Sequence, residues 1–112
     1  MNSGGALFVD PAQRGEALFL LAQSTGATAQ DTNQLKDAAL AYMRVVAACG
    51  SLPGKPHVAE SLLAAAATEE KLKNPKEALL IYNQMITEFA GTPAATKAKE
   101  NADRLSAAIP KG

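Results

Sequence analysis

The chain has 112 residues, enough for one compact domain, and 47% of them are hydrophobic while only 4% are aromatic. Its 11 basic and 11 acidic residues cancel to a net charge of zero, so no overall field favours nucleic acid or an anionic membrane as a partner. A single cysteine excludes an intramolecular disulfide and a cysteine-based metal cluster, and no apolar run approaches the roughly 18 to 20 residues that cross a bilayer.

The segment Asp10-Pro11-Ala12-Gln13 predicts the start of the first helix. Its aspartate accepts orphan amide hydrogen atoms, and its proline has no amide hydrogen to leave unpaired. We expect this helix to continue to about Ser24, with Gly26 as its terminator and a loop over residues 27–32. The residues at helical spacing that predict its buried stripe are Ala17, Leu18, Leu21 and Ala22.

The second helix is expected to begin near Asp31 or Thr32, because Asp31 and Gln34 have the spacing of a capping box. Gly50 closes it, and residues 51–56 include two prolines and one glycine, which disfavour a helix. Its predicted buried stripe follows an i, i+3, i+4, i+7 pattern over Leu35, Ala38, Ala39, Tyr42, Val45, Val46 and Cys49.

Three further helices are predicted from the remaining caps and prolines. The third runs from about Pro56 to Leu72, the fourth begins at Asn74-Pro75 and ends at a left-handed Gly91, and the fifth lies between Thr92 and Pro110. The residues expected to be buried are Ala59, Leu62, Leu63, Ala66 and Ala67 in the third helix, Ala78, Leu79, Tyr82, Met85, Ile86 and Phe89 in the fourth, and Ala94, Ala98, Ala102, Leu105 and Ile109 in the fifth.

The fifth helix has a charged outer face, which a terminal helix needs when nothing stacks beyond it. Glu100 and Arg104 on this face have the i, i+4 spacing that predicts a weak ion pair. The charged residues of the face are Lys97, Lys99, Glu100, Asp103 and Arg104.

An internal repeat relates the second helix to the fourth. The segment Lys36–Val46 returns about 40 residues later as Lys76–Ile86, with Lys, Ala, Leu and Tyr unchanged. Such a period indicates stacked units, each of which buries its apolar face against its neighbour. No long stretch alternates with the period of two that a half-buried strand shows, so the expected fold class is all-α, with antiparallel helix hairpins.

These hairpins resemble the tetratricopeptide repeat family. In that family the first helix of a repeat presents a large residue, a leucine and a small residue, and the second presents a small residue, an aromatic and another small or aliphatic residue. The matching positions are Leu18, Leu21, Ala22, Ala38, Tyr42 and Val45 in the earlier repeat, and Leu62, Ala65, Ala66, Ala78, Tyr82 and Met85 in the later one. Two stretches, AYMRVVAACGSLPGKPHVAESLLAAA and IYNQMITEFAGTPAATKAKENA, are also similar to bacterial envelope proteins of this class, such as the outer-membrane assembly lipoprotein and the TolA-binding division coordinator.

The resemblance implies a right-handed α-α superhelix of about two and a half hairpins. Residues 1–9 would form a flexible leader without a signal peptide, followed by a repeat domain over residues 10–109. Within it, one hairpin covers residues 10–50, a second covers residues 56–90, and a capping helix covers residues 92–109. The compartment is left open between the bacterial cell envelope, including the periplasm, and the cytoplasm.

Ligands of this family lie in a concave groove that is lined by the first helix of each repeat. Carried across residue by residue, the implied groove positions are Glu16, Phe19, Gln23, Glu60, Leu63, Ala67 and Glu70. Phe19 would serve there as an aromatic anchor, because it lies off the buried stripe, although its burial in the core is an equally open interpretation. The three glutamates predict a mildly acidic groove for a basic or neutral segment, unless they belong to ordinary solvated helix surface.

Few residues could support chemistry. For His57 we identify no set of nearby partners for metal binding or acid–base chemistry, so we interpret it as an exposed surface histidine. Cys49 lies on an apolar stripe and is interpreted as a small buried hydrophobic residue. Tyr42 and Tyr82 are assigned to the packed interior between helices. We therefore expect no catalytic site, no cofactor and no metal.

The leading hypothesis is a non-catalytic module that binds a peptide or helix of another protein in the groove. The alternative is a structural spacer or homo-oligomerisation unit that stacks end to end, or a fragment of a longer repeat array. An enzyme or ligand carrier would need a polar pocket converging on His57 or Cys49. No nucleic acid and no direct membrane insertion are expected, and the partner itself is not identified.

Overall fold

The computed structural model describes residues 11–108, which form five α-helices and no strand. The helices are α2 (Pro11–Thr28), α3 (Thr32–Cys49), α4 (Val58–Lys71), α5 (Pro75–Glu88) and α6 (Pro93–Ala108). The all-α prediction is confirmed. The expected leader over residues 1–9, the cap at Asp10, and the end of the last helix at Ile109 and Pro110 lie outside the described residues.

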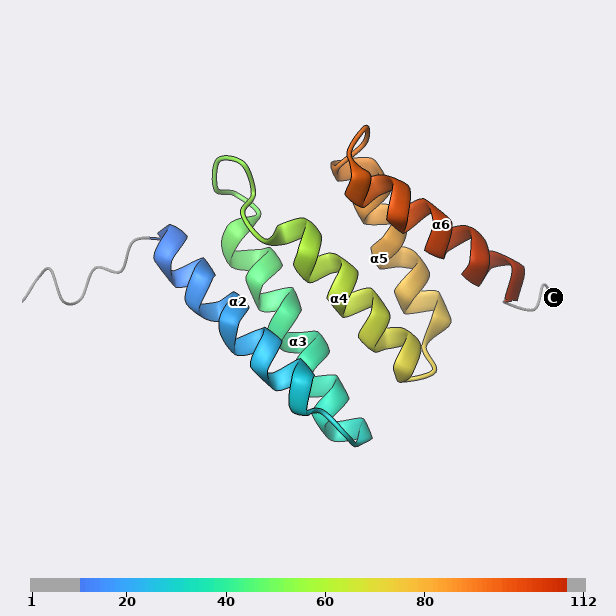
Figure 1. The fold of residues 1–112 in the computed structure, drawn as a ribbon, viewed down its shortest axis with the longest axis horizontal. Helices are drawn as coiled ribbons and strands as arrows, with labels where there is room; N and C mark the ends of the chain where they lie inside the picture. The colour runs from blue at the N-terminus through green and yellow to red at the C-terminus, as the bar shows by residue number, and fades with distance from the viewer. Residues whose placement is uncertain (1–10, 109–112) are drawn as a thin grey trace, which may run out of the picture.

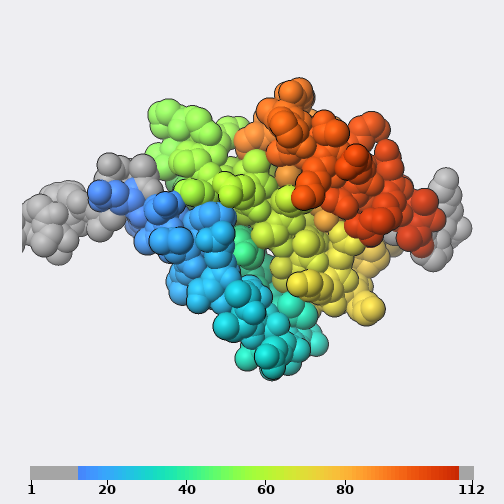
Figure 2. All heavy atoms as spheres, viewed as in Figure 1, coloured from blue at the N-terminus to red at the C-terminus, as the bar shows by residue number. Residues whose placement is uncertain are grey.

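Each helix packs on the helix that follows it in the sequence, and α4 also contacts α6. Figures 1 and 2 show α2, α4 and α6 on the near face of the molecule, with α3 and α5 behind them. The described part of the chain is therefore two layers deep, and α4 lies at its centre with helices on three sides.

Side chains cap α3 and α6 at the predicted starts, whereas Asn74 before α5 makes no side-chain cap bond. Asp31 has an extended backbone and accepts a hydrogen bond from the Gln34 amide at 2.8 Å, which begins α3. Gln34 Oε1 in turn accepts the amide hydrogen of Gln30 at 2.7 Å, so the reciprocal bond reaches one residue further back than in a capping box. The hydroxyl of Thr92 accepts the amide hydrogen of Ala95 at 3.3 Å and begins α6.

The predicted ends of α3 and α5 are also confirmed. The backbone N–H of Gly50 donates to the Val46 carbonyl at 2.8 Å and closes α3. Gly91 has a φ of 83°, the left-handed conformation that glycine adopts without a steric penalty, directly after the last turn of α5.

Gly26 does not terminate the first helix, which continues to Thr28. The residue serves packing instead, because a Cβ at this position would lie 3.3 Å from the ring and hydroxyl of Tyr42. Gly15 has the same role near the start of α2, where a Cβ would overlap Cys49 Sγ. The two glycines let α3 approach α2 closely along their whole contact.

The predicted buried stripe of α2 was wrong in part. The residues that face α3 are Gly15, Phe19 and Ala22, whereas Leu18 is half-buried and Leu21 is 58% exposed. The helix carries two apolar stripes, and side-chain hydrophobicity alone favoured the stripe with more leucine. The close contact made possible by glycine turns the other stripe toward the core.

The stripe of α3 is confirmed at its centre, where Ala38, Ala39, Tyr42, Val45 and Cys49 are buried. In α4 the buried surface is wider than predicted, because this helix contacts α3, α5 and α6. Two residues predicted to be buried are not, since Ala67 is exposed and Leu63 is half-buried. The buried residues are Val58, Ser61, Leu62, Ala65, Ala66 and Thr68 in α4, Ala78, Ile81, Tyr82 and Met85 in α5, and Ala95, Ala98, Ala102 and Leu105 in α6.

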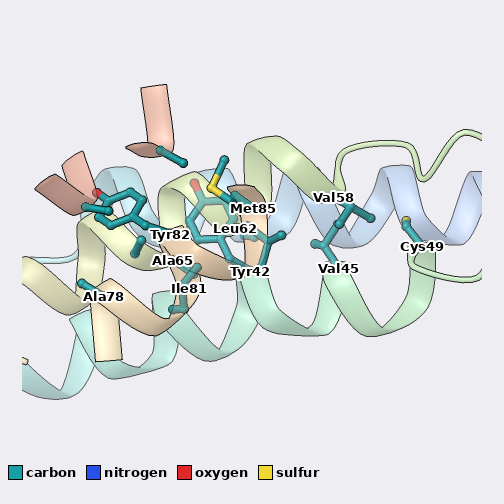
Figure 3. Packing of buried hydrophobic residues seen from close by; sticks show 14 of the residues in the cluster. Tyr42, Val45, Cys49, Val58, Leu62, Ala65, Ala78, Ile81, Tyr82 and Met85 are labelled. Carbon is teal, nitrogen blue, oxygen red and sulfur yellow. The ribbon is translucent and has the colours of Figure 1, made fainter. Parts of the chain in front are cut away.

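Tyr42 and Tyr82 belong to the core, as predicted, and are 9% and 1% exposed. Figure 3 shows both tyrosines in one packed cluster with Leu62 and Met85, so the two repeat-related tyrosines belong to the same core. Full burial of aliphatic and aromatic side chains of this size stabilises a fold by about 1.5 to 3 kcal/mol each.

The predicted ion pair between Glu100 and Arg104 is not formed. Arg104 Nη2 instead lies 2.9 Å from a carboxylate oxygen of Glu70, on α4, while Lys99 and Asp103 make a longer pair at 3.5 Å on α6 itself. Spacing along one helix could not reveal a partner that lies 34 residues away on another helix.

Candidate binding groove

An open groove of about 600 Å³ lies on the face formed by α2, α4 and α6. Figure 2 shows this face, with teal atoms of α3 visible in the hollow between α2 and α4. Helix α4 supplies a floor of small and aliphatic side chains, Leu63, Ala64 and Ala67. The groove is completed by Phe19 and Gln23 of α2, Tyr42 of α3, Glu60 and Glu70 of α4, Tyr82 of α5, and Lys97, Asn101 and Arg104 of α6.

Six of the seven groove positions implied by the sequence line this one groove. They are Phe19, Gln23, Glu60, Leu63, Ala67 and Glu70. The seventh, Glu16, lies on the same side of α2 but is engaged by His57. The helical register thus brings together residues that lie up to 51 positions apart in the chain.

Phe19 contributes to a wall of the groove and does not project into it. It is only 6% exposed, and its ring stacks on the imidazole of His57 with a centroid separation of 4.2 Å and an interplanar angle of 18°. The interpretation of Phe19 as a protruding anchor is therefore wrong, and the alternative of burial holds.

His57 is not an exposed surface histidine. Its Nε2 contacts the carboxylate of Glu16 on α2, and its Nδ1 lies 3.6 Å from Glu60 on α4. The residue precedes α4 in a left-handed conformation with a φ of 63°, which directs the ring back toward α2. The contact between His57 and Glu16 links α2 to the start of α4, although the two residues lie 41 positions apart in the sequence.

A second link joins α4, α5 and α6 at the other end of the groove. Tyr82 donates its hydroxyl hydrogen to Glu70 Oε2 at 2.7 Å, and Arg104 Nη2 donates to the same oxygen at 3.0 Å. Burial raises the pKa of Tyr82, and the hydrogen bond to Glu70 raises it further. Glu70 is held as a paired anion rather than left free to meet a ligand.

The groove is not acidic, contrary to the prediction from its three glutamates. Lys97 and Arg104 balance Glu60 and Glu70 in the lining, and both cations come from α6. Among residues 11–108, Lys97 has no ion-pair partner. The groove therefore has its carboxylates on α4 and its cations on α6.

Cys49 is fully buried against α2, as predicted, and lies outside the groove. Burial raises the pKa of its thiol, and the charge of Glu16 raises it further, so the protonated form is favoured. Neither Cys49 nor His57 lines the groove, and within residues 11–108 no cluster of three or more His, Cys, Asp and Glu side chains is placed to hold a metal.

The sequence did not reveal the contribution of α6 to the groove. Lys97 and Arg104 of its predicted charged face are exposed, as expected, but together with Asn101 they also line the groove beside α4. The missing information was the direction in which the last helix crosses α4, which no local signal in the sequence encodes.

No protein-family model matches the chain, and comparisons with curated proteins and with solved structures found no match. None of the described helices combines the length and the apolar character that a membrane crossing requires.

Proposed function

We propose that the chain is a non-catalytic, tetratricopeptide-like protein that binds a helix or peptide segment of another protein in the groove between α2, α4 and α6. In this proposal α2–α3 and α4–α5 are two repeat hairpins of a right-handed superhelix, and α6 is the capping helix. The repeated segments Lys36–Val46 and Lys76–Ile86 fall at corresponding places in α3 and α5, which supports this assignment.

The observation that carries the proposal is the apolar floor of the groove. Ala67 is exposed, Leu63 and Ala64 are half-exposed, and all three face the same hollow. Small residues allow the backbone of a guest helix to approach closely, and an amphipathic helix buries its apolar stripe in such a groove. Lys97 and Glu60 at opposite sides would orient the guest through complementary charges.

The substitution Ala67→Arg tests the proposal, because it fills the floor from an exposed position without touching the buried core. Ala47→Arg on α3 is the matched control, since Ala47 is also an exposed alanine within a helix and receives the same charge. We expect a partner captured by the wild-type protein to be retained by Ala47→Arg and lost by Ala67→Arg.

Mapping of amide chemical shifts on addition of the captured partner should then perturb α2, α4 and α6 on the groove side. Equal retention by both variants, or shifts confined to the outer faces of α3 and α5, would contradict binding in this groove. Circular dichroism of both variants verifies that helix content is unchanged.

A further inference from the structure

Helix α2 is apolar on two opposite sides. One side packs on α3 through Gly15, Phe19 and Ala22. The other side faces solvent and has its own i, i+3, i+4, i+7 pattern, which is typical of a helix seam. This outer seam consists of Ala17, Leu20, Leu21 and Ser24, all exposed, with each leucine 58% exposed.

The outer seam lies in an uncharged stretch. From Ala17 to Thr28 the helix contains no Asp, Glu, Lys or Arg, whereas each of the four other helices has charged side chains on its solvent face. A helix that is hydrophobic on all sides is normally buried, and a contiguous apolar surface rimmed by polar residues marks an interaction site. The seam therefore needs a cover.

We propose that α2 pairs antiparallel with α2 of a second copy of this chain, which makes a two-fold, head-to-head dimer. A second α2 is favoured over the other end of the molecule as the partner of the seam, because α6 exposes the charged residues Lys99, Glu100 and Asp103. A charged α6 surface is a poor match for an apolar α2 seam, so end-to-end stacking of head on tail is disfavoured. Only another α2 offers the same uncharged, leucine-bearing surface within the described chain.

The register of the pair follows from the seam itself. A two-fold axis between Leu20 and Leu21 places the leucines of both copies at the centre and Ala17 opposite Ser24 on either side of them, so small residues flank a leucine cluster. The charged residues nearest the seam, Arg14 and Glu16, then lie opposite Ala27 and Thr25 of the other copy. No like charges meet, and a net charge of zero adds no long-range repulsion between copies.

Sedimentation velocity tests the dimer at protein concentrations from about 10 μM to about 1 mM, the range expected for association through one pair of helices. The wild type should pass from monomer to dimer over this series. Leu21→Glu should weaken dimerisation at least about tenfold, because it buries a charge in the seam. Leu80→Glu is the matched control, since Leu80 is 64% exposed on α5, and it should dimerise like the wild type.

Cross-linking tests the register independently. Leu21→Cys should form a disulfide-linked dimer under mild oxidation, because the two-fold axis brings both copies of that position together. Leu80→Cys should not, and the native Cys49 is fully buried and serves as the background.

A wild type that stays monomeric up to about 1 mM would overturn the proposal. So would a dimer that Leu80→Glu disrupts as strongly as Leu21→Glu, or one that cross-links only through Leu80→Cys.

Discussion

Tyr42 and Tyr82 occupy equivalent places in the repeat but differ in what surrounds their hydroxyl groups. Tyr82 donates to Glu70 and is 1% exposed, whereas Tyr42 lies against Gly26, which has no side chain to accept a hydrogen bond. Among the described residues the Tyr42 hydroxyl has no hydrogen-bond partner. The later repeat is thus fixed by a charge-assisted bond that the earlier repeat lacks.

Removal of the hydroxyl group should therefore lower stability at Tyr82 but not at Tyr42. Tyr82→Phe keeps the packed ring and deletes the bond to Glu70, so we expect a loss of about 1 to 2 kcal/mol in the free energy of unfolding. Tyr42→Phe deletes no such bond and should change stability by less than about 0.5 kcal/mol. Urea unfolding followed by circular dichroism measures both. Equal effects of the two substitutions would contradict the hydrogen bond.

The same tyrosines predict a loss of stability in alkali. Burial raises the pKa of Tyr82, with Glu70 adding to the rise and Arg104 opposing it, and burial also raises the pKa of Tyr42. The unfolded chain ionises tyrosine near pH ~10, so this contribution is complete below that pH and is lost as the pH rises above it.

The slope is bounded by about 1.4 kcal/mol per pH unit for each tyrosine that stays protonated in the folded state. Urea midpoints measured from pH 8 to pH 11 should fall more steeply for the wild type than for Tyr82→Phe, because the variant has one such group fewer. Parallel curves over the alkaline range would show that Tyr82 ionises equally in both states.

At the scale of helices, the contact between α2 and α3 depends on the absence of side chains. Glycine inside a helix normally costs about 1 kcal/mol relative to alanine. Gly15 and Gly26 are retained within α2 where Cys49 and Tyr42 of α3 approach it. The close approach of two helices outweighs local helix propensity at these positions.

Gly15→Ala should accordingly lower the melting temperature although it improves helix propensity, because its Cβ overlaps Cys49 Sγ. Cys49→Ala removes the sulfur, so the double variant should be more stable than the sum of the single effects predicts, with a coupling of about 1 to 2 kcal/mol. Thermal unfolding of the four proteins in this cycle measures the coupling. Additive effects would mean that the two residues do not touch.

Helix positions could be predicted from the sequence because their signals are local. Asp31 with Gln34, Pro75 and Pro93 are start signals within one turn of the helix that each begins. Burial was predicted less well, since α2 presents two apolar stripes and only contact with α3 selects between them. Six of the residues implied for a groove line one hollow because helical register puts them on one side of α2 and α4.

The remaining features of the groove are set by tertiary contacts. His57 meets Glu16, and Arg104 meets Glu70, only after helices distant in sequence have packed. Within the lining, Lys97 and Arg104 of α6 balance Glu60 and Glu70 of α4. Nothing within a few residues of Arg104 identifies Glu70 as its partner, so the charge balance of the groove could not be predicted before the fold.

At the scale of the whole molecule, the helices form a series in which each contacts mainly its neighbours in sequence. Stability in such an array is approximately a sum of local units and the interfaces between them. Helix α4 has three neighbouring helices, while α2 has α3 as its main neighbour and a solvent-exposed seam on its other side. The ends should therefore open more readily than the centre.

Native-state hydrogen exchange should show this gradient in a dilute, monomeric sample. We expect amides of α4 to be the slowest, and those of α2 to exchange at least about tenfold faster, which corresponds to about 1.4 kcal/mol in opening free energy. Leu62→Ala, which removes a fully buried side chain of α4, should accelerate exchange most in α4 and in α3 and α5, which pack on it.

Leu21→Glu is the matched change at the end of the series, because its side chain makes little contact with the core. In dilute solution it should leave the exchange of α4 and α5 unaltered. A uniform opening free energy across the five helices would instead mean that they unfold as one cooperative unit. In that case α2 could not rearrange independently, and a guest in the groove would have to fit the walls as they stand.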